Sequence, residues 1–476
     1  MPDGFSVPSA TNASQMFNSC SSLLDLPEGF GAPNALNASQ MFRGCLSLSS
    51  LPEGFSASGA TNARYMFHNC RSLSSLPDSF SCPNTADAGY MFDGCRSLSA
   101  FPDGFSAPNI TDAEYMFTGC FSLQNMPNGF SSPSVTNTNN MFNSCSGLMG
   151  LPDGFACQGT ASARSMFTNC FSLSALPNGF SVPSATNTEY MFSGCRSLSS
   201  LPEGFSALNT ANAGSMFANC SSLMSLPAGF SVPSATNVNG MFTNCSSLLA
   251  LPDGFSCLSA TNTKYMFRNC PSLSSLPDGF SVPNVKNAGS MFYRCSGLFL
   301  LPEGFSCAGA TDTNSMFAYC YGLSGSALPD GFSVQNAAVT EGMFYDCKNL
   351  TGLPAGFSAP NTTNTAAMFA YCNALQSLPD GFSCQKTEHA NRMFYICPSL
   401  SSLPAGFSVP NATDTSNMFI NCRSLSALPD GFSVPNTTNA RFMFSGCSSL
   451  SALPDGFSAP NVTDANSMFK RLHLTD

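Results

Sequence analysis

Few residues of this sequence are charged, and none is tryptophan. Charged side chains make up 9 % of the 476 residues, as 17 Lys and Arg against 27 Asp and Glu, whereas soluble domains have roughly a quarter. Apolar residues nevertheless make up 43 %, which argues against a disordered polyelectrolyte. The net charge of −10 argues against binding to nucleic acid or to an anionic lipid surface, because both need clusters of basic residues.

Long apolar runs are also missing. No stretch approaches the roughly 20 apolar residues that span a bilayer, so we predict no direct membrane span. The first residues, Met1 to Phe5, show no signal-peptide pattern, and the sequence has no wall anchor or lipid-attachment region. These features leave a cytoplasmic location open.

Histidines and catalytic motifs are equally scarce. The three histidines, His68, His389 and His473, belong to distant parts of a repeating pattern. No G-x-S-x-G, P-loop or H-E-x-x-H motif occurs. We therefore predict that the protein is not an enzyme and has no catalytic residues, no bound metal and no cofactor.

The sequence consists of one unit of 25 residues, written nineteen times. Pro recurs every 25 residues from Pro2 to Pro302, shifts by two, and continues in the same step from Pro329 to Pro454. A Met-Phe pair follows each of these prolines by fourteen residues. A Cys follows the Phe by three residues in the first eighteen copies. Such internal repetition is typical of stacked repeat proteins.

The regularity predicts a single domain of nineteen copies over residues 1–476. Two extra residues near 324–327 are interpreted as an insertion, and residues 470–476 as a short cap on the last copy. The first copy lacks such a cap, which predicts end-to-end self-association or a covering partner at its bare edge. Each position of the repeat is called a column and takes its number from the first copy, so that column 15 contains Gln15, Gln40 and every equivalent residue.

The spacing of apolar residues predicts a helix in each copy. Columns 13, 16, 17, 20 and 23 are apolar, which is the spacing of one helical face. Column 12 is Asn, Asp or Ser in seventeen copies, as a helix N-cap requires. We predict a helix from about Ala13 to Ser22, followed by a short parallel strand at Leu23–Leu26; a competing register places the strand at Met16-Phe17. The predicted fold class is an α/β solenoid of about nineteen 25-residue strand-turn-helix units.

The order of these motifs resembles a known family. A Met-Phe-x-x-Cys block followed by Cys-x-x-Leu-x-x-Leu-Pro is similar to the BspA-like leucine-rich-repeat surface proteins of bacteria and some protozoan parasites. The resemblance covers essentially the whole chain. It implies a right-handed leucine-rich-repeat stack and a role in adhesion to host proteins, cells or other microbes, and it brings no catalytic residues with it.

Variation between the copies is concentrated in columns 14, 15, 18, 19 and 21. All eleven tyrosines and all twelve arginines lie in these columns, and Tyr and Arg among small polar residues are the mixture that binding surfaces use. The alternative is that outward positions of any repeat drift freely. If these columns bind a partner, the predicted contact residues are Tyr65, Tyr90, Tyr115, Tyr190, Tyr265, Tyr293, Arg64, Arg71, Arg96 and Arg268.

Eighteen cysteines occupy column 20 at a constant spacing. Zinc sites need four ligands with short local spacings, whereas this column lies on the same face as the Met and Phe columns. We therefore predict buried structural thiols, with an occasional disulfide as the main alternative and metal binding as a weaker one. The predicted structural ladder begins with Phe17, Phe42, Cys20, Cys45 and Cys70.

Together these patterns predict a non-enzymatic binding protein whose variable columns recognise a protein or glycan partner. The family resemblance favours a cell-surface or secreted adhesin for host or microbial molecules. The alternative is an intracellular protein-interaction scaffold or inhibitor built on the same repeat, which unpaired thiols and the missing export signal favour.

Overall fold

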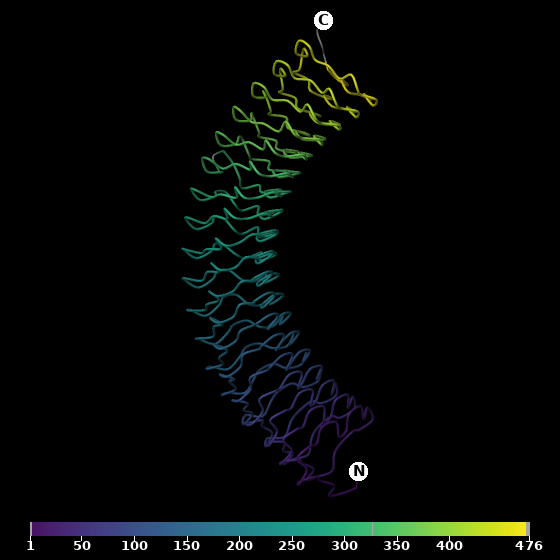
Figure 1. The fold of residues 1–476 in the computed structure, drawn as a ribbon, viewed down its shortest axis with the longest axis vertical. Helices are drawn as coiled ribbons and strands as arrows, with labels where there is room; N and C mark the ends of the chain where they lie inside the picture. The colour runs from purple at the N-terminus through teal and green to yellow at the C-terminus, as the bar shows by residue number, and fades with distance from the viewer. Residues whose placement is uncertain (1, 326, 473–476) are drawn as a thin grey trace. The chain divides into compact units, whose positions relative to one another are not determined.

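The computed structural model describes residues 2–325 and 327–472. Residue 326 of the predicted insertion and residues 473–476 of the predicted cap lie outside the described residues. The chain divides into two compact units, residues 1–234 and 235–476. Within each unit the copies follow one another as a stack of narrow coils (Figure 1). The described residues form no α-helix and no extended strand, but only turns and isolated parallel β-bridges.

The predicted α/β solenoid of strand-turn-helix units is therefore wrong. In place of the helix, columns 13–20 contain three overlapping turns, in which the N–H groups of Met16, Asn18 and Cys20 donate to carbonyls three residues earlier. Leu23–Leu26 forms no strand, and neither does the competing register at Met16-Phe17. The leucine-rich-repeat geometry that the family resemblance implied is absent with these elements.

Left-handed residues explain why no helix forms. Columns 15 and 19 have positive φ angles in every copy, for example 59° at Tyr65 and 60° at Asn69, whereas an α-helix needs negative φ at each residue. Column 19 is Gly or Asn in eleven of the nineteen copies, and these residues tolerate the left-handed region best. The frequent Gly and Asn of column 19 therefore suit the left-handed backbone.

Because right-handed and left-handed residues alternate, the backbone N–H and C=O groups of this segment point along the axis of the stack, toward the neighbouring copies. The N–H groups of columns 13, 15, 17 and 19 donate to carbonyls of columns 12, 14, 16 and 18 in the next copy, as Phe17 does to Met41 at 2.8 Å. The carbonyl of Thr11 completes the β-bridge by accepting from the backbone of the second copy at Leu36 and Asn37. Within each unit, the coils are thus held to their neighbours by backbone hydrogen bonds, and few polar groups of this segment are left unpaired.

The side chains of column 12 accept hydrogen bonds from the backbone, as their composition predicts. They cap a turn, however, and not the N-terminus of a helix. The Oδ1 atom of Asn62 accepts from the N–H of Arg64 at 3.0 Å, which is the geometry of an Asx-turn. At Ser162, Asn139 of the preceding copy takes this role, accepting from the hydroxyl of Ser162 at 2.7 Å and from the N–H of Arg164 at 3.0 Å.

The core is a set of ladders, each made of one residue type. The ring of Phe17 stacks on that of Phe42 with centroids 5.3 Å apart, and Phe42 meets Phe55 of column 5 edge-on at 5.9 Å. Both contact geometries are favourable for aromatic rings. Met of column 16 and Leu of column 23 are fully buried beside them in most copies. The columns with apolar spacing do face the interior, although no helix presents them.

The cysteines of column 20 form a regular ladder of free thiols. The Sγ atom of Cys45 donates to the carbonyl of Phe17 at 3.2 Å, and Cys70 donates to Phe42 at 3.0 Å, so each thiol bonds to the preceding copy. All 23 cysteines are free, and every one except Cys20 is buried. Burial, together with the nearby Cys20, raises the pKa of the Cys45 thiol to about 12. These thiols are packing residues with a weak hydrogen bond.

A substitution at column 19 tests the left-handed backbone. Asn169 is exposed and has a φ of 60°, and among the residues of columns 15 and 19 only Ile396 is β-branched. We expect Asn169→Val to lower the free energy of unfolding by about 1–2 kcal/mol, because a β-branched residue is strained in this region. The measurement is urea denaturation of the full chain. Asn169→Gly serves as the control and should change stability by less than about 0.5 kcal/mol; equal effects of the two variants would contradict the assigned backbone.

Candidate functional site

The variable columns bring several of the predicted contact residues together. In the first unit, the rings of Tyr65, Tyr90 and Tyr115 form a continuous stack with centroid distances of 4.6 and 4.5 Å. The guanidinium of Arg64 lies 5.3 Å from the ring of Tyr65 and 5.2 Å from that of Tyr90. This spacing places the cation against two aromatic faces.

Carboxylates of the first unit neutralise Arg64. Its guanidinium lies 3.3 Å from Asp87, 3.2 Å from Asp112 and 3.7 Å from Glu114, which belong to the next two copies. The side chain of Arg64 therefore joins three successive copies, and its charge is already satisfied within the chain. A residue bound in this way contributes to the cohesion of the stack as well as to its surface.

The other predicted contacts of the first unit lie apart from this stack. Tyr190 is exposed, and Arg164 lies 5.7 Å from its ring while pairing with Glu189 at 3.0 Å. Arg96 covers the ring of Phe121 at 5.6 Å. Arg71 is exposed in column 21. The first unit thus presents separate pairs of aromatic and cationic side chains.

A longer series of cations and rings lies in the second unit. Arg268 is 5.4 Å from the rings of both Tyr265 and Tyr293. Arg294 of the following copy is 5.5 Å from Tyr293 and 5.2 Å from Tyr319. The result is an alternation of tyrosine and arginine across three consecutive copies, of which the sequence analysis had named only the first three members.

The series continues as tyrosines alone. Consecutive ring centroids from Tyr293 through Tyr319, Tyr345 and Tyr371 to Tyr395 are 5.2 to 5.4 Å apart. These residues alternate between columns 18 and 19, so the series zigzags, and no single column of the sequence contains it. Burial and then neighbouring tyrosines raise the pKa of the Tyr345 hydroxyl. We call the following residues the tyrosine band: Tyr265, Tyr293, Tyr319, Tyr321, Tyr345, Tyr371 and Tyr395.

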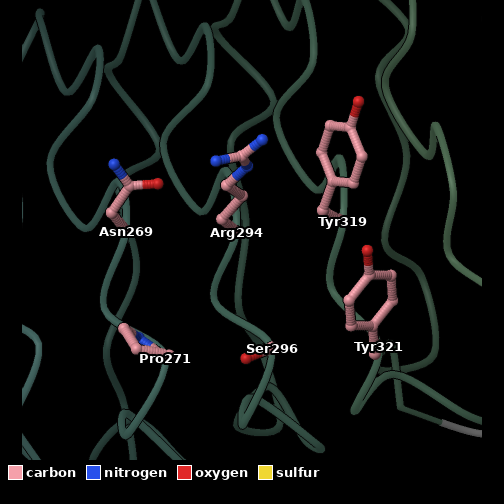
Figure 2. Close-up of a pocket in the computed structure, with 6 residues that line it drawn as sticks. All are labelled: Asn269, Pro271, Arg294, Ser296, Tyr319 and Tyr321. Carbon is pink, nitrogen blue, oxygen red and sulfur yellow. The ribbon is translucent and has the colours of Figure 1, made fainter.

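Two hollows open beside the tyrosine band. The first has a volume of about 310 Å³, and Figure 2 shows its lining on three successive coils: Asn269 and Pro271, then Arg294 and Ser296, then Tyr319 and Tyr321. The second has a volume of about 210 Å³ and is lined by Tyr345, Ala367, Ala370, Tyr371, Arg392 and Tyr395.

The first hollow combines aromatic faces with unpaired polar groups. Among the described residues, neither Arg268 nor Arg294 has a carboxylate within ion-pair distance, in contrast to Arg64. The buried Oδ1 atom of Asn269 has no hydrogen-bond donor, although its Nδ2 donates to Asn244 at 2.7 Å. At the far edge, the hydroxyl of Tyr321 donates to Asp346 at 3.1 Å. The hollow therefore offers a cation that has no ion-pair partner.

Neither a metal centre nor a membrane span emerges from the geometry. Within residues 2–325 and 327–472, no group of three or more His, Cys, Asp and Glu side chains is placed to hold a metal ion. In the same ranges, no helix is long and apolar enough to cross a membrane.

Comparison with known proteins gives one family. The model of a family described as Mycoplasma protein of unknown function, DUF285, matches five overlapping or adjacent stretches of the chain. No curated protein and no solved structure matches the chain. The matched residues are 3–105, 103–205, 203–300, 311–432 and 363–475.

Proposed function

The chain belongs to the DUF285 family, a family of unknown function, and from that premise we propose that it is a non-enzymatic binding protein. Its variable columns 14, 15, 18, 19 and 21 recognise a protein or glycan partner. The tyrosine band is the observation that carries this proposal. Exposed and half-buried tyrosines over a background of Ser, Asn and Gly provide a large contact area at a low cost in side-chain entropy.

The backbone of the stack supports this role. The N–H groups of columns 13, 15, 17 and 19 bond to the next copy, so side chains can change in the variable columns without altering the path of the chain. Binding residues are commonly placed on loops that a rigid scaffold positions. Here the turns are both the scaffold and the loops, and the copies differ mainly in the side chains that they carry.

The finer form of the proposal is an adhesin at the cell surface or in the secreted fraction. Similarity to BspA-like surface proteins in the motif order supports it. Protease treatment of intact native cells, with mass spectrometry of the released peptides, tests the location. Release of repeat peptides without lysis is the expected result. Peptides that appear only after lysis would favour the intracellular scaffold or inhibitor instead, because the buried free thiols suit a reducing compartment.

Binding itself is tested with substitutions that the repeat already contains. On a partner captured from a protein or glycan array, we expect the triple variant Tyr345→Ser, Tyr371→Asn and Tyr395→Ser to weaken affinity at least about tenfold, as loss of an aromatic cluster does. Ser and Asn already occur in columns 18 and 19 of other copies, so the fold should persist, as circular dichroism will check.

The first unit provides the matched comparison. The variant Tyr65→Ser, Tyr90→Ser and Tyr115→Ser removes the same number of rings from column 15. Weakening by this variant alone would place the binding surface in the first unit. If both variants bind with unchanged affinity while remaining folded, the proposal that the tyrosines form a binding surface fails, and free drift of outward residues is the better interpretation.

End-to-end association through the first copy stays a prediction, which the mass of the protein in solution tests.

A further inference from the structure

The first hollow of the second unit lies in a cationic part of the variable columns. Lys264, Arg268 and Arg294 lie in the variable columns of two consecutive copies, and these columns contain no Asp or Glu in the same copies. The whole protein carries a net charge of −10. A cationic patch on an acidic protein favours an anionic ligand, because the patch attracts negative charge that the rest of the surface repels.

Arg294 is a cation in the lining of the hollow, and Arg268 belongs to the preceding copy. Tyrosine rings lie 5.4 Å from Arg268 and 5.2 and 5.5 Å from Arg294. The guanidinium of Arg294 can pair through two N–H groups with the two oxygens of a carboxylate. Within the described residues no carboxylate of the chain takes that place.

The remaining polar groups of the hollow suit hydroxyl groups. The hydroxyls of Ser296 and Tyr319 belong to the lining. The Oδ1 atom of Asn269 has no donor and is turned toward the coil of Arg294 in Figure 2, but it is buried and offers almost no surface to a ligand. The volume of about 310 Å³ is at the lower end of the range for small-molecule sites, roughly 300–1,000 Å³.

An extended peptide fits the hollow less well. The N–H groups of Asn269, Arg294 and Tyr319 each donate to a carbonyl of the next copy at 2.8 Å. These backbone groups are therefore not available to pair with a peptide as an added strand, which is how many extended peptides gain affinity. What the hollow offers is ring faces, a guanidinium edge and side-chain polar groups.

We propose that this hollow binds an acidic sugar unit of a glycan, with the carboxylate of a uronate on Arg294 and the apolar face of the sugar ring against Tyr319 and Tyr321. The hydroxyls of Ser296 and Tyr319 in the lining pair with sugar hydroxyls. This inference rests on the proposed binding function and specifies the ligand class of one site within it.

Calorimetric titration of the full chain with a hyaluronan tetrasaccharide tests the site, and the carboxyl-reduced tetrasaccharide is the control ligand. We expect Arg294→Asn to weaken binding of the acidic form at least about tenfold, the loss of a bidentate charge-assisted contact. The same variant should leave the weaker binding of the reduced form unchanged. Tyr319→Asn should weaken both forms by roughly fivefold, because it removes the ring face.

Matched variants keep the experiment interpretable. Asn occupies column 19 in six copies, so both substitutions retain a residue that tolerates the positive φ of 60° at Arg294 and 63° at Tyr319. Arg164→Asn removes a stacked arginine from the first unit and should leave tetrasaccharide binding unchanged. Equal weakening by Arg164→Asn and Arg294→Asn would overturn the site, since it would show a non-specific charge effect.

Two further outcomes separate this inference from the broader proposal. No binding of either tetrasaccharide, together with binding of an acidic Glu-rich hexapeptide that depends on Arg294, would overturn the sugar assignment and leave the binding function in place. The site would also be overturned if the protein bound neither the tetrasaccharide nor the peptide, and if only the variant at Tyr345, Tyr371 and Tyr395 lost its affinity for partners from the array. That result would leave the proposed binding function in place. The proposed function fails separately, when neither set of tyrosines affects any partner.

Discussion

Above pH 9 the folded stack is expected to lose stability steeply and to unfold before pH 12. Burial holds ten thiols at a pKa of about 12 in the folded chain, against an ordinary value of 9.0. Because the pKa is raised by folding, the stabilising contribution is complete below pH 9 and is lost as the pH rises toward 12.

The size of the effect comes from the number of thiols. Each pH unit above 9 lowers the free energy of unfolding by about 1 kcal/mol per buried thiol, which is on the order of 10 kcal/mol for the ten together. That sum equals the whole stability of an ordinary domain, which is about 5–15 kcal/mol. Urea denaturation between pH 8 and pH 11 under a reducing agent measures it.

Five cysteines in column 7 provide a control that leaves no cavity. Val occupies this column in seven other copies, so valine should pack there without strain. Replacing all five should make the free energy of unfolding fall less steeply with pH, because these five thiols no longer ionise on unfolding. A stability that stays constant from pH 8 to pH 11 would contradict the burial of the ladder. The residues to replace are Cys82, Cys157, Cys257, Cys307 and Cys384.

The second large effect is expected from Phe117→Ala, which should lower the free energy of unfolding of the first unit by about 4 kcal/mol. Phe117 is fully buried, with the rings of Phe142 at 5.1 Å and Phe101 at 5.3 Å. Because each coil contacts mainly its neighbours, the loss should be largest in the adjacent copies. Hydrogen exchange along the chain measures it copy by copy, since long repeat arrays need not unfold in one step.

A neighbouring phenylalanine provides the comparison. Phe121 is 43 % exposed and belongs to column 21, where Ser is common. Phe121→Ser should cost less than about 1 kcal/mol, mainly through the lost contact with the guanidinium of Arg96. Similar losses in Phe117→Ala and Phe121→Ser would show that the phenylalanine ladders do not form the core.

The sequence predicts which residues are buried better than it predicts the conformation of the backbone. The recurrence of Met16, Phe17 and Cys20 correctly indicates buried columns, since apolar side chains at that spacing must share a face. A helix was the wrong conclusion because a run of turns with left-handed residues gives the same spacing. The Asn and Gly of column 19, and the near absence of β-branched residues from columns 15 and 19, are the signal that distinguishes the two.

The sequence predicts which columns contain the candidate site, but it does not predict which of their side chains contact one another. Columns 14, 15, 18, 19 and 21 contain every tyrosine, and this pattern alone named Tyr265, Tyr293 and Arg268. The zigzag from Tyr293 to Tyr319 crosses columns and depends on two side chains of different columns meeting at 5.3 Å. Reasoning within one column cannot find such a contact, and neither can it find the missing donor at Asn269.

The direction of the backbone hydrogen bonds has a consequence for how such a gene changes. Every coil within a unit presents donors to one neighbour and acceptors to the other in the same columns, so any copy is a suitable neighbour for any other. Deletion or duplication of a multiple of 75 nucleotides would join two unfamiliar copies without a mismatch at the seam. Unequal recombination between copies would then lengthen, shorten or reorder the surface in a single event while the fold is retained.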